Sequence, residues 1–271
     1  VTQISLVINT IFASYLQSGS ITWMYYADRM TELPTGVLGV ALGTILLPTL
    51  SKYAGGRNPR EFSKLLDWGL RLCCLLAAPA ALGLAMLSFP LIATMFMNKG
   101  FTLNDAVMTK NALIACSFCV VGQIMIKVLA PAFYAQQNIK TPVKVAVFSL
   151  IVTQLMNIAF IVPLKHVGLS LSVGLGACLN AALLLTLLRL KGLYQPDAGW
   201  RRFLTKLAIA LAVMCFGLWA AQSFMPMQWT DIRGWQKALQ LGWLVLLGIT
   251  LYFTSLALLG FRPRDFKRSE V

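Results

Sequence analysis

Apolar runs of about 20 residues recur along this chain and are separated by short polar stretches. A helix rises about 1.5 Å per residue, so each run is long enough to cross roughly 30 Å of hydrocarbon. Inside lipid every backbone N–H and C=O group needs an internal partner, and uninterrupted apolar runs favour helices over barrel strands. The pattern predicts an all-α polytopic membrane protein. Its eight transmembrane helices are predicted at residues 3–18, 20–50, 70–97, 112–135, 143–163, 167–190, 203–224 and 238–260.

The composition agrees with this class. Hydrophobic residues make up 58% of the 271 residues and charged residues only 12%, whereas soluble domains carry roughly 25% charged residues. The net charge of +14 could suggest nucleic acid, but the basic residues cluster between apolar runs, so we expect no nucleic-acid partner. The chain starts with Val1, almost inside an apolar stretch and without a signal peptide. We therefore expect it to be the later part of a longer polypeptide.

The basic residues alternate strictly with the predicted spans. Sixteen of the 23 Lys and Arg residues lie in one set of loops and five in the other. Cytoplasmic loops carry the excess of Lys and Arg, so the C-terminus is predicted to be cytoplasmic. The basic set comprises Lys52, Arg57, Arg60, Lys64, Arg71, Lys140, Lys144, Arg189, Lys191, Arg201, Arg202, Lys206, Arg262, Arg264, Lys267 and Arg268.

Three charged residues in the second apolar segment need an explanation. Asp28 and Glu32 are four apart and share a helix face, and Arg29 is three before Glu32, so these two can pair. Two acids flanking one base would hold the guanidinium extended. The residues after Glu32 can cross a bilayer alone, which would place the cluster at the outer mouth of the membrane. The alternative places it on the wall of a water-filled cavity, where an arginine binds phosphate well.

Lys127 lies deeper in an apolar run. It is about eight residues, or 12 Å, from the polar residues after Ala135, which is further than a lysine stem reaches by snorkelling. Pro131 removes the backbone donor to the carbonyl of Lys127, and Gln123 shares its helix face. An ionisable residue inside a membrane is a functional candidate. We expect Lys127 to face a cavity.

Other polar and small residues have simpler explanations. Gly39 and Gly43 form a GxxxG spacing that is typical of close helix packing. His166 is predicted to be solvated in a short outer loop, and the CxxC spacing of Cys116 and Cys119 is assigned to packing instead of redox chemistry or metal binding. Hydrogen bonding between helices is the expected role of Asn9, Gln154, Asn157 and Asn180.

Enzyme signatures are missing from the sequence. It contains no HExxH, GxSxG, GxxxxGK or GxGxxG motif, and a single histidine rules out most metal or triad arrangements. Transport or lipid handling is therefore expected instead of catalysis.

Three stretches resemble a known family, the MurJ (MviN) lipid II flippases. They are SGSITWMYYADRMTELPTGVLGVALGTILLPTLSK at 18–52, KVLAPAFYAQQNIKTPVKVA at 127–146 and TQLMNIAFIVPLKHVGLSLSVGLGACLNA at 153–181. The family has fourteen membrane helices in two six-helix lobes and a terminal pair. The resemblance implies that residues 1–190 form the C-terminal transport lobe. Residues 191–271 would form the two terminal helices, with a groove for the lipid tail and a basic cytoplasmic tail. The partner would be the missing N-terminal lobe.

The resemblance also implies a function. Family members move undecaprenyl-pyrophosphate-linked peptidoglycan precursor (lipid II) from the inner to the outer leaflet by alternating access. Asp28, Arg29, Glu32 and Lys127 would then bind the substrate. Thr22, Gln123 and Asn157 are secondary candidates for polar residues of the cavity. No catalytic or metal-binding residue is implied.

The sequence leaves two points open, the energy source of transport and the functional class. Some family members have a sodium site with acids on the helices that match the first and fifth spans, where this chain has Asn9, Gln154 and Asn157. Membrane potential is therefore expected as the bias in place of sodium, with no cofactor. The alternatives are an exporter of another polyprenyl-linked glycan or of drugs, and a non-transporting scaffold for cell-wall synthesis proteins.

Overall fold

The computed structural model describes residues 2–56, 58–97, 100–224, 229 and 234–261. Its regular structure within these ranges is entirely helical, which confirms the predicted all-α class. Six of the helices (α2, α3, α5, α6, α7 and α8) are long and apolar enough to cross a membrane. The helices are α1 (Thr2–Ser14), α2 (Ser20–Gly55), α3 (Pro59–Met86), α4 (Ser88–Met95), α5 (Leu103–Ala135), α6 (Lys140–Leu190), α7 (Trp200–Phe224) and α8 (Gly234–Leu258).

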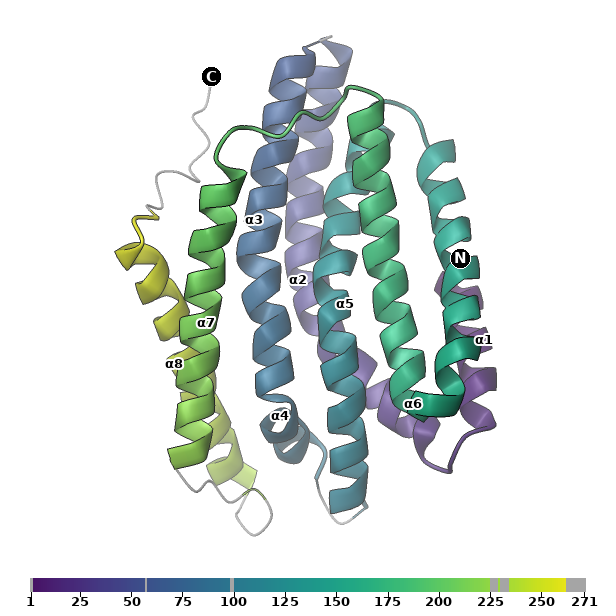
Figure 1. Cartoon of the computed structure of the whole chain (residues 1–271), viewed down its shortest axis with the longest axis vertical. Coiled ribbons are helices and arrows are strands. Elements are labelled where there is room, and N and C mark those ends of the chain that lie inside the picture. Colours follow the sequence, from purple (N-terminus) through teal and green to yellow (C-terminus); the bar gives the residue numbers. More distant parts are fainter. Residues whose placement is uncertain (1, 57, 98–99, 225–228, 230–233, 262–271) are drawn as a thin grey trace.

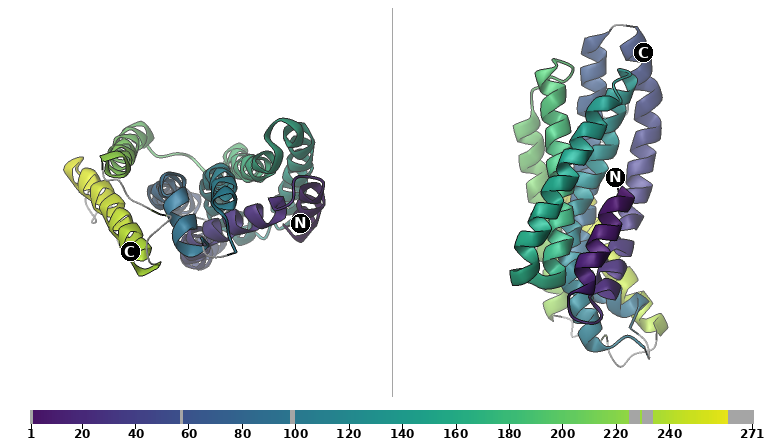
Figure 2. Two further views of the ribbon diagram at one scale, coloured as in Figure 1. Left: turned by 90° about the horizontal axis from the view of Figure 1, so that it is seen from below. Right: turned by 90° about the vertical axis from the view of Figure 1, so that its right-hand side faces the viewer.

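The long helices run roughly side by side along one axis (Figure 1). The α7–α8 pair lies at one side of the bundle, and α1 with α6 lies at the other, as the end-on view also shows (Figure 2). The main packing partners are α2 with α5, α5 with α6, α3 with α5, and α7 with α8. Helix α5 is therefore the central element, which packs against α2, α3 and α6.

The connections alternate between the two ends of the bundle (Figure 1). One end holds the turn between α2 and α3, the α5–α6 connection and the linker from α6 to α7. These are the segments in which the basic residues cluster. We call this the basic end; the opposite end holds the start of α2, α4 and the turn inside α6. The alternation on which the predicted orientation depends is therefore present in the fold.

Helix α6 is two antiparallel helices joined by a tight turn, as Figure 1 shows. Lys165 at the turn has φ 51° and ψ −131°, and Pro163 precedes it. The turn falls between the predicted spans 143–163 and 167–190. Gly168 permits it, because a Cβ there would lie 2.5 Å from the carbonyl oxygen of Phe160. The hairpin thus needs a residue without a side chain at this position.

Some predicted boundaries are wrong. Helix α1 has 13 residues, a rise of about 20 Å, and is shorter than the predicted span 3–18. The predicted span 70–97 is divided at Leu87 into α3 and the short α4. Helix α5 begins nine residues earlier than predicted because a capping box between Thr102 and Asp105 starts it among polar residues. Hydropathy marks the apolar section of a helix, not its capped ends.

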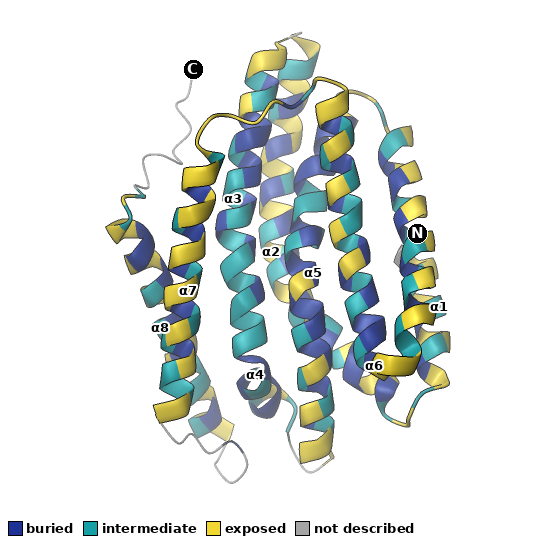
Figure 3. Ribbon diagram, in the orientation of Figure 1, coloured by how far each residue is buried: buried dark blue, intermediate teal, exposed yellow. Residues whose placement is uncertain are grey.

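Buried side chains concentrate where helices face one another, whereas the outer faces expose large apolar residues (Figure 3). One apolar cluster joins α2, α3 and α5 through side chains such as Leu46, Leu66 and Val128. A second joins α3 and α4 to α7 and α8 through Leu207, Leu218 and others. Outward-facing apolar side chains fit a multi-pass membrane protein, in which lipid covers them.

Candidate functional site

Arg29 lies on an exposed face of α2 and is held by two neighbours on the same helix. Its Nη1 donates to Glu32 Oε2 at 2.7 Å, and its Nε donates to the Tyr25 hydroxyl at 3.1 Å. The guanidinium also lies 5.2 Å from the centre of the Tyr25 ring. The side chains of Arg29 and Glu32 remain 54% and 62% exposed. The pair predicted from the spacing is present, and it is open to whatever fills the space beside α2.

Asp28 does not flank Arg29 as the sequence suggested. Its Oδ1 accepts a long bond of 3.5 Å from the Cys116 thiol of α5, so the carboxylate turns toward the bundle. It lines a small cavity of about 100 Å³ together with Asn9 of α1 and Ser170 of α6. Adjacent helix positions are about 100° apart around the axis, so Asp28 and Arg29 point to different neighbours. Glu32 alone among the acids here orients the arginine.

The Lys127 side chain extends from α5 to the backbone of α2. Its Nζ donates to the backbone carbonyl of Thr35 at 2.8 Å, and the side chain is half-buried. Thr35 is three residues after Glu32, a rise of about 4.5 Å along α2. The bond to a carbonyl leaves the positive charge of the ammonium without a carboxylate among the described residues, and it uses one of three donors. The structure therefore brings Lys127 close to the Arg29–Glu32 pair in height along α2.

Gly39 provides the space for the Lys127 stem. A Cβ at Gly39 would overlap Cδ of Lys127 and would lie 3.1 Å from both Cε and Nζ. Gly43, one turn later, faces the carbonyl oxygen of Lys127, whose backbone donor Pro131 removes. The GxxxG spacing thus packs α2 against α5, as predicted, and the lysine lies in that contact. The spacing alone gave no sign of the second role.

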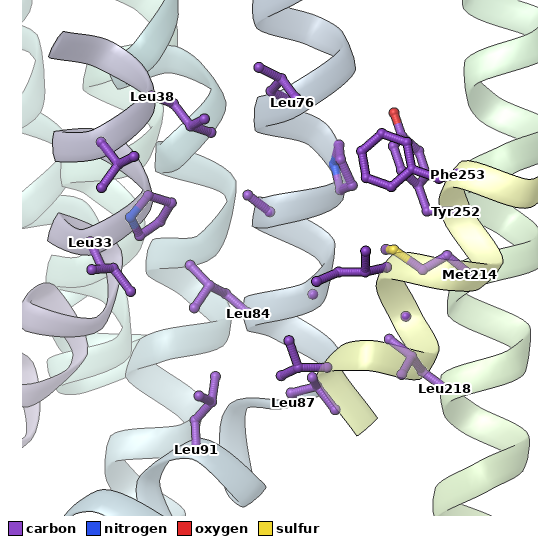
Figure 4. A pocket seen from close by; sticks show the side chains of 18 residues that line it. Leu33, Leu38, Leu76, Leu84, Leu87, Leu91, Met214, Leu218, Tyr252 and Phe253 are labelled. Atoms are coloured by element: carbon purple, nitrogen blue, oxygen red, sulfur yellow. The ribbon is translucent and has the colours of Figure 1, made fainter. Parts of the chain in front are cut away.

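An apolar groove, whose lining side chains are shown in Figure 4, begins on α2 one helical turn after Arg29. It has a volume of about 540 Å³ and starts at Leu33 and Pro34 of α2. Helices α3, α7 and α8 and the Leu91 side chain of α4 complete its walls. Tyr252 also lines it, but its hydroxyl donates to the Leu75 carbonyl at 2.6 Å. The groove is therefore suited to hydrocarbon, and Arg29 lies one helical turn before its first lining residue, Leu33, on the same face of α2.

The secondary candidates are dispersed. Thr22 is exposed on α2, two turns before Arg29, and Gln123 is half-buried with no hydrogen bond to a described residue. Asn157 is fully buried, and its Nδ2 donates to Asn9 Oδ1 at 2.7 Å and to Gln154 Oε1 at 3.0 Å. Asn157 therefore joins α6 to α1, which confirms the hydrogen bonding between helices predicted for it, whereas its assignment to a cavity wall stays a prediction.

His166 is also placed differently from the prediction. Its side chain is buried, its Nε2 lies 3.2 Å from the Met108 carbonyl, and its ring packs at 5.1 Å against Trp23. Trp23 donates to Asp105 Oδ1 at 2.8 Å. These contacts join the starts of α2 and α5 to the turn of α6. A hydropathy plot reports a turn here but cannot report that the turn folds back onto its neighbours.

Sequence reasoning missed the residues that position the two cations. Tyr25 is four residues before Arg29, so the i, i+4 rule could have found it. Thr35 acts through its backbone carbonyl, for which side-chain type carries no signal. The thiols of Cys116 and Cys119 are free and buried, as helix packing requires. Within the described residues, no group of three or more His, Cys, Asp and Glu side chains could hold a metal ion.

Comparison with known proteins places this fold. Residues 1–233 match the family model described as lipid II flippase MurJ. A lipid II flippase MurJ from Burkholderia cenocepacia is 48% identical over 273 residues, which cover 99% of this chain and 52% of that protein. A probable lipid II flippase MurJ from Vibrio cholerae is 37% identical over 268 residues, covering 98% of this chain and 51% of that protein.

A solved structure agrees on the fold. Lipid II flippase MurJ in an inward closed conformation matches with a TM-score of 0.79 at 22% identity, over 98% of this chain and 52% of that chain. The chain spans about half the length of the relatives it matches. The family match covers most of the residues, and two relatives exceed 30% identity over nearly the whole chain. The chain therefore belongs to the lipid II flippase MurJ family.

Proposed function

We propose that this chain is the C-terminal half of a flippase that moves lipid II from the inner to the outer leaflet of the bacterial cytoplasmic membrane. One observation carries the proposal: the exposed Arg29 lies four residues before Leu33, on the face of α2 where the apolar groove begins. A polyprenyl pyrophosphate has the same division into a charged head and a hydrocarbon tail. Relatives named as lipid II flippases share the whole region.

Arg29 and Lys127 would hold the pyrophosphate. Arg29 presents a planar fork that suits phosphate oxygens, and Glu32 and Tyr25 keep it extended. Lys127 has donors left after its bond to Thr35, so it can add a second positive charge. Attraction between these charges and a diphosphate lowers the cost of moving the anionic head through a region of low dielectric. Alternating access would then move the head while the tail stays in lipid or in the groove.

The proposal also includes the domain organisation, the orientation in the membrane and the energy source. Residues 1–190 act as the transport lobe and residues 191–271 as a terminal pair that forms the groove, with the C-terminus in the cytoplasm. Activity needs a second lobe facing Arg29. Membrane potential drives the cycle in place of sodium, since Asn9, Gln154 and Asn157 stand where a sodium site would have acids, and their amides bond to one another. The Asp28 carboxylate shares a cavity with Asn9 but accepts from the Cys116 thiol. Loss of flipping on collapse of the potential at constant sodium would support this, and loss on sodium removal alone would contradict it.

The test is complementation of a flippase-depleted strain by the full-length protein that contains this chain. Arg29→Ala and Lys127→Met should each abolish growth at normal protein levels. The methionine keeps the packing of the lysine stem against Gly39, so it isolates the charge. Arg60→Ala is the matched control, because Arg60 is exposed at the basic end of the same bundle.

Arg60→Ala should grow normally. Full growth of both Arg29→Ala and Lys127→Met would contradict the assigned roles. Growth that is lost with all three variants would indicate a general sensitivity to charge, and it would equally contradict them.

A further inference from the structure

A second cavity lies at the basic end of the bundle, away from the Arg29–Glu32 pair. It has a volume of about 380 Å³ and lies between the start of α3, the start of α7 and residues 260–261 that follow α8. In Figure 1 the start of α7 and the end of α8 lie at the upper left, and α3 runs beside α7. Its walls carry four basic side chains, Lys64, Arg71, Arg202 and Lys206. Its volume is in the range of small-molecule sites, roughly 300–1,000 Å³. We call it the basic pocket.

We propose that the basic pocket binds the phosphate group of an anionic membrane lipid and so joins the α7–α8 pair to α3. The proposal does not rest on lipid II transport or on Arg29. It rests on the charges that line the pocket, on the way its walls are held, and on its aromatic rim.

The cations of the pocket differ in how they are paired. Lys64 pairs with Glu61 at 2.9 Å, and Arg71 pairs with Asp67 at 2.7 Å. Arg202 and Lys206 make no ion pair with any residue that the structure describes. They are four residues apart on α7, so both side chains lie on one face and can reach a common anion. Two unpaired cations beside one cavity are a binding arrangement for phosphate.

The opposite wall is rigid. Buried Asp67 accepts hydrogen bonds from Tyr194 at 2.8 Å and from the Trp200 indole at 2.6 Å, in addition to the bond from Arg71. Burial and the bond to Asp67 raise the pKa of the Tyr194 hydroxyl above its usual range, so it stays a donor at neutral pH. The linker from α6 to α7 is thereby fixed to α3, and the start of α7 is held at a set position. A pocket with a fixed wall loses little entropy on binding.

The rim matches the boundary of a membrane. Trp68, Phe203 and Phe261 line the pocket, and Lys206 Nζ lies 5.4 Å from the centre of the Phe261 ring. Trp side chains, such as Trp68 here, are typical of the headgroup level of a bilayer. Basic pockets between membrane helices on the cytoplasmic side suit anionic headgroups. A lipid phosphate therefore fits better than a soluble anion.

The experiment measures lipid binding to the purified protein by native mass spectrometry. Phosphatidylglycerol and phosphatidylcholine with identical acyl chains are the probes, and phosphatidylglycerol should bind more tightly. The double variant Arg202→Gln/Lys206→Gln should weaken phosphatidylglycerol binding about 30-fold, at about fivefold per basic residue. The matched control is Lys140→Gln/Lys144→Gln, which removes two exposed charges from the same end of the bundle outside the pocket. It should change the dissociation constant by less than about twofold, because distant exposed charges are screened.

A third variant, Asp197→Asn, is expected to strengthen phosphatidylglycerol binding instead of weakening it. Asp197 lines the pocket and is exposed, and only its backbone N–H donates to Asp67. Asp197→Asn keeps that bond and removes a repelling charge, so it should tighten phosphatidylglycerol binding. Weaker or unchanged binding by this variant would contradict the proposal.

Competition with inorganic phosphate tests whether the pocket binds a lipid phosphate or free phosphate. Inorganic phosphate in large molar excess should not displace phosphatidylglycerol from the wild-type protein; displacement at concentrations comparable to those of the lipid would overturn the lipid assignment. Equal weakening by both double variants would show unspecific attraction to a basic surface and would also overturn it. So would the absence of weakening by Arg202→Gln/Lys206→Gln in a protein that still folds.

Discussion

Two Arg–carboxylate pairs among the residues that the structure describes have the same chemistry but different surroundings. Arg71 and Asp67 form a pair whose side chains are 24% and 4% exposed, and the carboxylate also accepts from Tyr194 and Trp200. Arg29 and Glu32 form a pair of equal length, 2.7 Å, on a face where both side chains are more than half exposed. The buried pair has its hydrogen bonds filled by the protein. The exposed pair has capacity left for another molecule.

The difference indicates that the buried Arg71–Asp67 pair stabilises the fold, whereas the exposed Arg29–Glu32 pair is available to bind another molecule. A buried pair that loses one partner leaves an uncompensated charge or donors without an acceptor, which is costly. An exposed pair contributes little to stability. Lys127 is intermediate, since it is half-buried and bound to a backbone carbonyl. We therefore expect mutations at Asp67 to affect folding, mutations at Arg29 to affect transport, and mutations near Lys127 to affect both.

The largest expected effect on stability is at Asp67. Asp67→Ala leaves Arg71, Tyr194 and Trp200 without their acceptor, so the unfolding free energy should fall by about 3–5 kcal/mol. Glu61→Ala is the matched control, since it breaks the exposed pair with Lys64 on the same helix and should cost less than about 1 kcal/mol. Unfolding of the purified protein in mixed micelles measures both. Equal losses would remove the distinction between the two kinds of pair.

A smaller effect is expected at Gly39. Gly39→Ala places a Cβ on the Lys127 stem and should destabilise the protein by about 1–3 kcal/mol. Gly36→Ala is the control, because nothing lies within 4 Å of a Cβ there, and it should be neutral or slightly stabilising. Combining Gly39→Ala with Lys127→Ala should recover part of the loss. Additive losses would show that the lysine stem does not occupy the space at Gly39.

The smallest effect concerns Tyr25. Tyr25→Phe removes one hydrogen bond to exposed Arg29 and keeps the ring beneath the guanidinium, so stability should change by less than about 1 kcal/mol. Transport by the full-length protein should fall only a few-fold, because Glu32 still holds the arginine. Tyr26→Phe is the control: its ring packs on Phe96 and Phe101, and it should behave as wild type. Complete loss of transport with Tyr25→Phe would assign the tyrosine a direct role.

The sequence predicted the fold class and the alternation of basic loops because both follow from bulk hydropathy and charge. It also predicted the Arg29–Glu32 pair, since i, i+3 spacing fixes proximity on a helix. It failed for Asp28, which contacts Cys116 of another helix. For Asn157 it predicted a hydrogen bond between helices but not the partner, Asn9, which is 148 residues away. Such contacts depend on helix rotation and tertiary packing, which periodicity does not fix. The position of Lys127 against Thr35 could not be predicted for the same reason.

Binding of a pyrophosphate by Arg29 requires that water reach this side chain, whereas the apolar groove should face hydrocarbon. Labelling of introduced cysteines by a charged, membrane-impermeant thiol reagent makes this distinction in the full-length protein, after the six native cysteines of this region have been replaced. Arg29→Cys and Glu32→Cys should react with the reagent. Val37→Cys, 63% exposed at the native valine but on the apolar groove, should not react. If positions 29 and 32 resist the reagent as position 37 does, the pair faces acyl chains, and Arg29 does not bind pyrophosphate.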